Sequence, residues 1–85
     1  MSISVNVLFF ASAREAAGVG EVSIDLEEGQ QKASCLLQQL QDMYTDLNFE
    51  GARISVAVNK NYIGDNDVCL KQGDEVALLP PIAGG

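Results

Sequence analysis

The sequence has no histidine and only two cysteines, Cys35 and Cys69, which lie far apart in the chain. Two cysteines without histidine cannot complete a tetrahedral zinc site or a four-cysteine iron–sulfur cluster, so we expect no bound metal. There is no C-x-x-C pattern either. We therefore interpret both cysteines as reduced, buried, small apolar side chains with no redox or nucleophilic role.

Basic residues are also scarce, since five of them stand against twelve acidic residues and give a net charge of −7. A surface this acidic argues against binding to nucleic acid or to anionic membranes, and it favours a basic protein partner. The first six residues contain no basic segment, no long apolar run and no small-residue cleavage site. We therefore expect a cytoplasmic protein.

Motifs for catalysis within the chain are missing as well. The sequence has no G-x-S-x-G, no H-E-x-x-H and no glycine-rich phosphate loop followed by lysine. The acidic pairs Asp65 with Asp67 and Asp74 with Glu75 are typical of turns and solvated charge in so acidic a chain. We expect no cofactor to be bound by this chain.

The residues that are present suffice for one folded domain, because 47% of them are apolar and 20% are charged. A short strand at residues 62–63 is expected to form a hairpin with the strand at residues 54–58, through the turn residues Asn59 to Asn61. The other expected strands have period-two alternation or β-branched and aromatic enrichment, and they cover residues 3–10, 21–26, 54–58 and 75–79.

Two helices are predicted between these strands. Ser12 and Glu15 have capping-box spacing and Gly18 can end the segment, so residues 12–17 should form a short helix. Helical spacing of leucines predicts the main helix over roughly residues 31–44, although its start has no Ser, Thr, Asp or Asn cap. The order of elements predicts an α+β fold of the β-grasp (ubiquitin-like) type, with a mixed sheet of about five strands.

The expected first strand changes character along one of its faces. On this face the first half of the strand carries the polar residues Ser4 and Asn6, whereas the second half carries the apolar residues Leu8 and Phe10. The apolar half is either covered by the protein itself or exposed for a partner. The last strand is apolar on both faces, which indicates a central strand or an edge used for binding.

The C-terminal residues have the most unusual context in the chain. Pro80 and Pro81 offer no amide donors to a sheet and bias the chain toward an extended course, so the domain should comprise residues 1–81 and the flexible tail residues 82–85. The tail, Ile82-Ala83-Gly84-Gly85, reaches at most roughly 13 to 14 Å and is thin enough to enter a slot. A carboxylate at Gly85 is a poor electrophile, so its use in group transfer requires activation by an ATP site on another protein.

Residues 73–85, GDEVALLPPIAGG, resemble the C-terminal signature of the small subunits of molybdopterin synthase, a family of ubiquitin-like sulfur carriers. The segment Val7-Leu8-Phe9-Phe10-Ala11, followed by Arg14-Glu15, is similar to the first strand and short helix of that family. Chain length and element order agree over the whole sequence. The missing hydroxyl cap of the main helix is one departure from the family pattern.

The resemblance implies that an adenylyltransferase similar to ubiquitin-activating enzymes activates Gly85 with ATP, and that a sulfurtransferase converts it to a thiocarboxylate. The tail, from Pro80 and Pro81 through Ile82, Ala83 and Gly84, would then enter a pocket of the synthase large subunit. There Gly85 would donate sulfur to cyclic pyranopterin monophosphate, with two small subunits serving one large-subunit dimer. Phe9 or Phe10 and Leu78 or Leu79 would supply the docking patch.

Three alternatives remain. A thiamine-type sulfur carrier shares the fold and the Gly-Gly end, but it is usually shorter and lacks the Pro-Pro signature. A ubiquitin-like protein modifier would form isopeptide bonds between Gly85 and lysines of other proteins. A plain binding module would use the tail without any chemistry.

Overall fold

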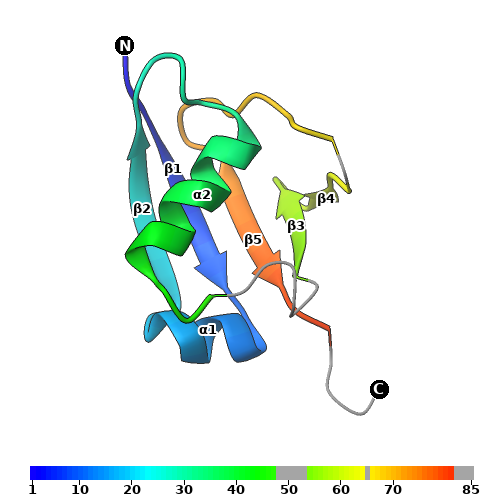
Figure 1. The fold of residues 1–85 in the computed structure, drawn as a ribbon. Helices are drawn as coiled ribbons and strands as arrows, with labels where there is room; N and C mark the ends of the chain where they lie inside the picture. Colours follow the sequence, from blue (N-terminus) through cyan, green and yellow to red (C-terminus); the bar gives the residue numbers. More distant parts are fainter. Residues whose placement is uncertain (48–53, 65, 82–85) are drawn as a thin grey trace.

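The computed structural model describes residues 1–47, 54–64 and 66–81, and within these ranges the chain forms a five-stranded mixed sheet with two helices (Figure 1). The order of the strands in the sheet is β2-β1-β5-β3-β4, in which β1 and β5 are parallel and the other pairs are antiparallel. This is the β-grasp arrangement that the sequence predicts. The strands are β1 (Ile3–Phe9), β2 (Glu21–Leu26), β3 (Ser55–Val58), β4 (Asn61–Tyr62) and β5 (Glu75–Leu79), and the helices are α1 (Ala11–Ala17) and α2 (Ala33–Met43).

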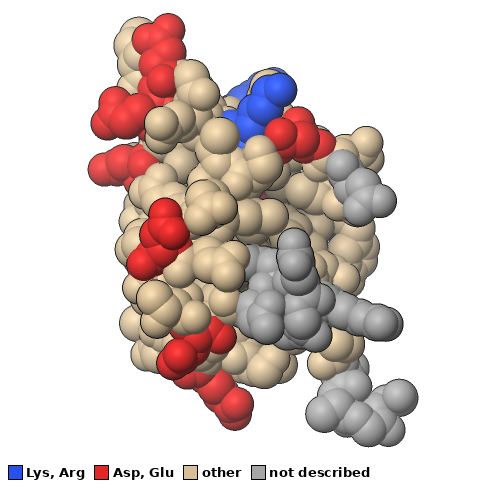
Figure 2. Space-filling view, viewed as in Figure 1, with Lys and Arg blue, Asp and Glu red and all other residues tan. Residues whose placement is uncertain are grey.

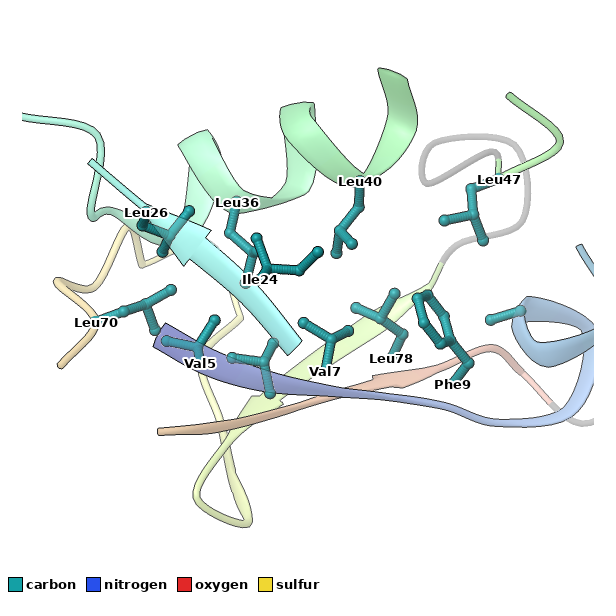
Figure 3. Packing of buried hydrophobic residues seen from close by; sticks show 12 residues of the cluster. Val5, Val7, Phe9, Ile24, Leu26, Leu36, Leu40, Leu47, Leu70 and Leu78 are labelled. Carbon is teal, nitrogen blue, oxygen red and sulfur yellow. The ribbon is translucent and has the colours of Figure 1, made fainter. Parts of the chain in front are cut away.

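The core lies between one face of the sheet and helix α2, which crosses that face (Figures 1 and 3). Leu36 and Leu40 of α2 are fully buried against the sheet. Because side chains alternate along a strand, every second residue of β1, β2 and β5 points into this layer. Burial of one such leucine or valine contributes about 1.5 to 3 kcal/mol. The buried strand residues are Val5, Val7, Phe9, Ile24, Leu26, Val76 and Leu78.

Strand β5 is central, which is the first of the two alternatives that its apolar faces left open. It pairs in parallel with β1, where Phe9 lies opposite Leu78, and antiparallel with β3, where Val56 lies opposite Leu78. Parallel strands end at the same edge of a sheet. The chain therefore leaves β5 at the edge where β1 turns into α1, and the Phe10 N–H donates to the Leu78 carbonyl at 3.3 Å.

Helix α1 begins one residue earlier than expected, and the predicted capping box is wrong. The N-cap residue is Phe10, which makes no side-chain capping hydrogen bond, and Ser12 lies inside the first turn. Ala11 has a φ of 49°, the left-handed region that costs a residue with a Cβ roughly 1 to 2 kcal/mol. At the other end Gly18 has a φ of 80° and donates its N–H to the Arg14 carbonyl at 2.8 Å, which confirms the predicted glycine cap.

Helix α2 starts without a local cap, as the sequence indicates, and the segment before β5 provides one instead. Asp67 accepts the Ser34 N–H through Oδ1 and the Ser34 hydroxyl through Oδ2, both at 2.8 Å. These two hydrogen bonds, helped more weakly by the charge of Lys32, hold the pKa of the Asp67 carboxyl below its ordinary value. The interpretation of Asp67 as a solvated turn residue is thus corrected, because it caps a helix remote in sequence. Asp65 lies outside the described residues.

The hairpin between β3 and β4 is confirmed, with its second strand one residue earlier than expected. Asn59 and Lys60 form the two-residue turn and have φ values of 50° and 73°. Two successive residues with positive φ match the twist of a tight hairpin. Ile63, which the sequence assigns to the strand, lies just beyond it.

The two cysteines differ in their surroundings. Both are free, but Cys35 is half-buried in α2 whereas Cys69 is exposed. Cys69 lies in the irregular segment before β5, which is joined to the start of α2 by the hydrogen bonds of Asp67 to Ser34 and by an isolated backbone bridge between Cys69 and Lys32. Its side chain is nevertheless exposed. The expectation of two buried cysteines is therefore wrong for Cys69.

Candidate functional site at the exit of the last strand

The two halves of the C-terminal signature lie at opposite ends of β5. At the beginning of the strand, Gly73 has a φ of 85° and donates its N–H to the Ser4 carbonyl at 2.8 Å. Asp74 accepts the Lys71 N–H at 2.8 Å and the Asn59 side-chain amide at 3.0 Å. This half of the signature joins β5 to β1 and to the β3–β4 turn, so its role is structural, as expected for an acidic turn residue.

The second half of the signature leaves the sheet beside α1. Pro80 is buried at the end of β5 and Pro81 is exposed. Pro80 has no N–H to offer a neighbouring strand, which ends the ladder at Leu79. Ile82, Ala83, Gly84 and Gly85, which the sequence proposes as the inserted tail and the reactive end, lie outside the described residues, so the boundary at residue 81 stays a prediction.

The structure separates the four residues expected to dock a partner. Phe9 and Leu78 are only 3% and 0% exposed, so assigning them to a docking surface is wrong. Their side chains point into the core, where the Phe9 ring packs edge-on against Tyr44 with ring centroids 5.5 Å apart. Phe10 is 44% exposed and Leu79 is half-buried on the other face of the sheet, and these two residues remain available to a partner.

The sheet face opposite α2 carries an apolar band toward the end of β5. One row of paired residues runs across four strands: Leu8, Ala77, Ala57 and Tyr62. Tyr62 is 72% exposed at its end of the row. The next row, toward the start of β5, is polar and consists of Ser23, Asn6 and Glu75. The switch in character along the first strand is therefore confirmed, and among the described residues no helix covers this apolar half.

Sequence reasoning missed Ala57 and Tyr62 as members of this face. The sequence could have indicated the pairing of Tyr62 with Ala57, because a two-residue turn aligns these residues once the hairpin is recognised. The pairing of β3 with β5 could not be read from the sequence. That pairing places Ala57 beside Ala77, with Tyr62 on the other side of Ala57.

At the corner where β1 ends, the surface is hollowed. The open hollow measures about 510 Å³ and is lined by Leu8, Phe9, Phe10, Ala11, Arg14, Gly20 and Glu21. It combines apolar side chains with one base and one acid, and it lies at the same edge as the exit of β5. Such a corner can take up a protruding side chain of another protein.

Within the described ranges, no three His, Cys, Asp or Glu side chains are grouped as a metal site would need. The same part of the chain contains no helix with the length and apolar character required to cross a membrane.

The chain is a ubiquitin-like β-grasp protein. This class is defined by the order of its elements and by the helix that crosses a mixed sheet, and here the chain leaves the sheet beside an apolar patch. The sequence model of the ThiS family matches residues 7–85, and the chain belongs to this family. It is 37% identical over 84 residues to the molybdopterin synthase sulfur carrier subunit of Chlamydomonas reinhardtii, and the match covers 98% of this chain and 100% of that protein.

Two solved structures agree with this placement. The small archaeal modifier protein 1 of Methanosarcina acetivorans superimposes with a TM-score of 0.78 at 28% identity, covering 100% of this chain and 99% of that one. The complex of subunits 1 and 2 of the molybdopterin-converting factor from Helicobacter pylori contains a chain that matches with a TM-score of 0.71 at 26% identity, covering 98% of this chain and 100% of that one.

Proposed function

We propose that this chain is the sulfur carrier subunit of a molybdopterin synthase, with the sulfur carried on the carboxyl group of Gly85. The observation that carries the proposal is the similarity, over nearly the whole chain, to a protein with that name. The direction in which β5 delivers the chain supports it, because β5 ends at the edge where the exposed Phe10 donates its N–H to the Leu78 carbonyl. A cytoplasmic location belongs to the same proposal, since the activation step consumes ATP.

The chemistry divides between this chain and its partners. A carboxylate resists nucleophiles, so a ubiquitin-activating-like adenylyltransferase first converts the Gly85 carboxylate to an acyl-adenylate and releases pyrophosphate. A sulfurtransferase then supplies the sulfur that displaces AMP and leaves a thiocarboxylate. Transfer of this sulfur to cyclic pyranopterin monophosphate takes two loaded carriers for each dithiolene. The chain thus acts as the sulfur-donating subunit of a two-subunit sulfurtransferase.

The partner that receives the tail is the large subunit of the synthase, two copies of which would bind two copies of this chain. The Helicobacter pylori structure, described as a complex of subunits 1 and 2, supports this partner. Because Pro80 is buried at the end of β5, its expected insertion is corrected, and the part of the chain that enters the pocket of the large subunit runs from Pro81 through Ile82, Ala83 and Gly84. The apolar band, with Phe10 and Leu79 at its tail end, rests against the surface around that pocket.

The test is to incubate the chain with its adenylyltransferase, ATP and a sulfur source and then to measure its intact mass. We expect the mass gain of one oxygen exchanged for one sulfur, located at Gly85. A matched control carries one extra residue after Gly85, which displaces the carboxyl group and should abolish the gain without affecting folding. An unchanged mass of the unextended chain would contradict the proposal.

A second function, conjugation to proteins, is favoured by one observation. The structure that matches over 100% of this chain is described as a small archaeal modifier protein. In that case the adenylated Gly85 would be attacked by a lysine amine and form an isopeptide bond. The discriminating result is a series of higher-mass adducts in cells that disappears when Gly85 is deleted.

A further inference from the structure

Arg14 occupies the corner where β1 and β5 end. Its exposed side chain lies over Gly20, with Nε 3.6 Å and one terminal nitrogen 3.9 Å from the position that a Cβ on Gly20 would take. The Gly20 carbonyl accepts the Phe9 N–H at 2.8 Å, which fixes this backbone beside the end of β1. The guanidinium therefore rests on a rigid surface, and the exposed Phe10 belongs to the same hollow.

The charged residues that line this corner are Arg14 and Glu21. The other described bases, Lys32, Lys60 and Lys71, belong to the opposite end of the sheet, because they sit near the start of β5 or in the β3–β4 turn. Figure 2 agrees for the α2 face, where carboxylates follow the β2 side and basic side chains gather away from α1. Arg14 is therefore the one described base at the end of the sheet where β5 exits, in a chain with a net charge of −7.

Arg14 has no carboxylate partner among the described residues, where the one ion pair joins the Met1 amino group to Glu28. Glu21 lines the same hollow and lies opposite Leu8, but it forms no ion pair with Arg14. Among the described residues, the corner thus presents a guanidinium without a carboxylate partner at the rim of an apolar patch. A protein that covers Phe10 and Leu8 would remove water from one side of this cation, which makes a facing carboxylate more favourable.

We propose that Arg14 is a specificity-determining residue that binds a carboxylate of the large subunit, at the rim of the apolar contact made by Leu8, Phe10 and Leu79. The inference rests on the proposed function, since it names the contact of the same surface. The short tail supports it: from Ile82 to Gly85 an extended chain reaches roughly 13 to 14 Å, so the protein that receives Gly85 must lie close to the end of β5, which is at the same edge of the sheet as this corner.

The experiment measures the Kd between this full-length chain and the large subunit over a series of salt concentrations. Arg14→Ala should weaken binding about three- to tenfold and flatten the salt dependence, because a screened charge pair is lost. Arg14→Glu should weaken it further, and Arg14→Lys should recover only part of the affinity, since lysine cannot bind a carboxylate with two parallel hydrogen bonds. Lys60→Ala, at the far end of the sheet, is the matched control and should leave the Kd unchanged.

Thermal unfolding of each variant checks that the exposed substitution leaves the fold intact. The inference is overturned if Arg14→Ala and Arg14→Glu bind the large subunit with the affinity and salt dependence of the wild type. It is equally overturned if they weaken binding only to the adenylyltransferase; in both cases the proposed function stands. Failure of the wild-type chain to bind the large subunit and to gain sulfur contradicts the proposed function itself.

Discussion

Asp67 caps helix α2 through Ser34, a residue 33 positions away in the sequence, by accepting both its N–H and its hydroxyl hydrogen. The Ala33 N–H donates to the Val68 carbonyl at 2.9 Å, and the Leu70 N–H donates to the Gln31 carbonyl at 2.7 Å. The first turn of α2 therefore obtains its hydrogen-bond partners from the segment that leads into β5. This segment and the helix hold each other in place over the core.

Asp67→Asn and Asp67→Ala should both lower the unfolding temperature at neutral pH, the alanine variant more, because an amide retains one acceptor oxygen. The pKa of Asp67 is lower in the folded state than its usual value of 3.8, so its contribution to stability is complete above that value. The contribution is lost as the pH falls through the lowered pKa. Denaturant unfolding at neutral and at strongly acidic pH should show the difference between wild type and Asp67→Asn shrinking with acid. Equal stabilities at neutral pH would refute the capping role.

Substitutions of the two neighbouring phenylalanines should affect different properties: the stability of the fold for Phe9 and the binding of the large subunit for Phe10. Phe9→Ala removes a fully buried ring and should cost about 3 to 5 kcal/mol of unfolding free energy. Phe10→Ala should cost about 1 kcal/mol or less, because this ring is partly in solvent, yet it should weaken binding to the large subunit. The measurements are denaturant unfolding and the Kd of the complex. Full affinity of Phe10→Ala would remove Phe10 from the docking surface.

Lys60→Gly should stabilise the chain by about 1 kcal/mol, because glycine adopts the left-handed conformation without the cost of a Cβ. Lys60 has a φ of 73° in the second position of the turn, after Asn59. The thermal midpoint should rise while sulfur loading of Gly85 stays the same. Lys71→Gly is the comparison variant and should bring no gain. A fall in the midpoint of Lys60→Gly would contradict the turn geometry.

Asp74→Ala should destabilise the fold by about 1 to 3 kcal/mol, since the Lys71 N–H and the Asn59 amide lose their acceptor. Its folded fraction should still accept sulfur at Gly85, because Asp74 lies at the opposite end of β5 from the tail. Intact mass after the loading reaction, corrected for the folded fraction, provides the measurement. A folded variant that cannot be loaded would show that this acid takes part in recognition by the adenylyltransferase.

Much of the fold could be predicted because its signals are local. The bounds of β2 and β5 agree with the predicted residues 21–26 and 75–79, since alternation and flanking turn residues mark both ends. The start of α1 could not be predicted in the same way. Pairing of Phe9 with Leu78 ends β1 and forces the chain to turn at Ala11, and this long-range contact overrides the capping preference of Ser12.

The sequence by itself determined the β-grasp order and the candidate reactive end, because alternation, turn residues and the C-terminal signature are local properties of the chain. It left open whether β5 is central or an edge strand, and the fold places it in the centre. Only the tertiary structure decided which of Phe9 and Phe10, and of Leu78 and Leu79, is buried in the core and which stays accessible. Adjacent strand residues point to opposite faces, and α2 covers one of those faces. The cap from Asp67 and the corner formed by Arg14, Gly20 and Phe10 also required the fold, because they join segments that the sequence keeps apart.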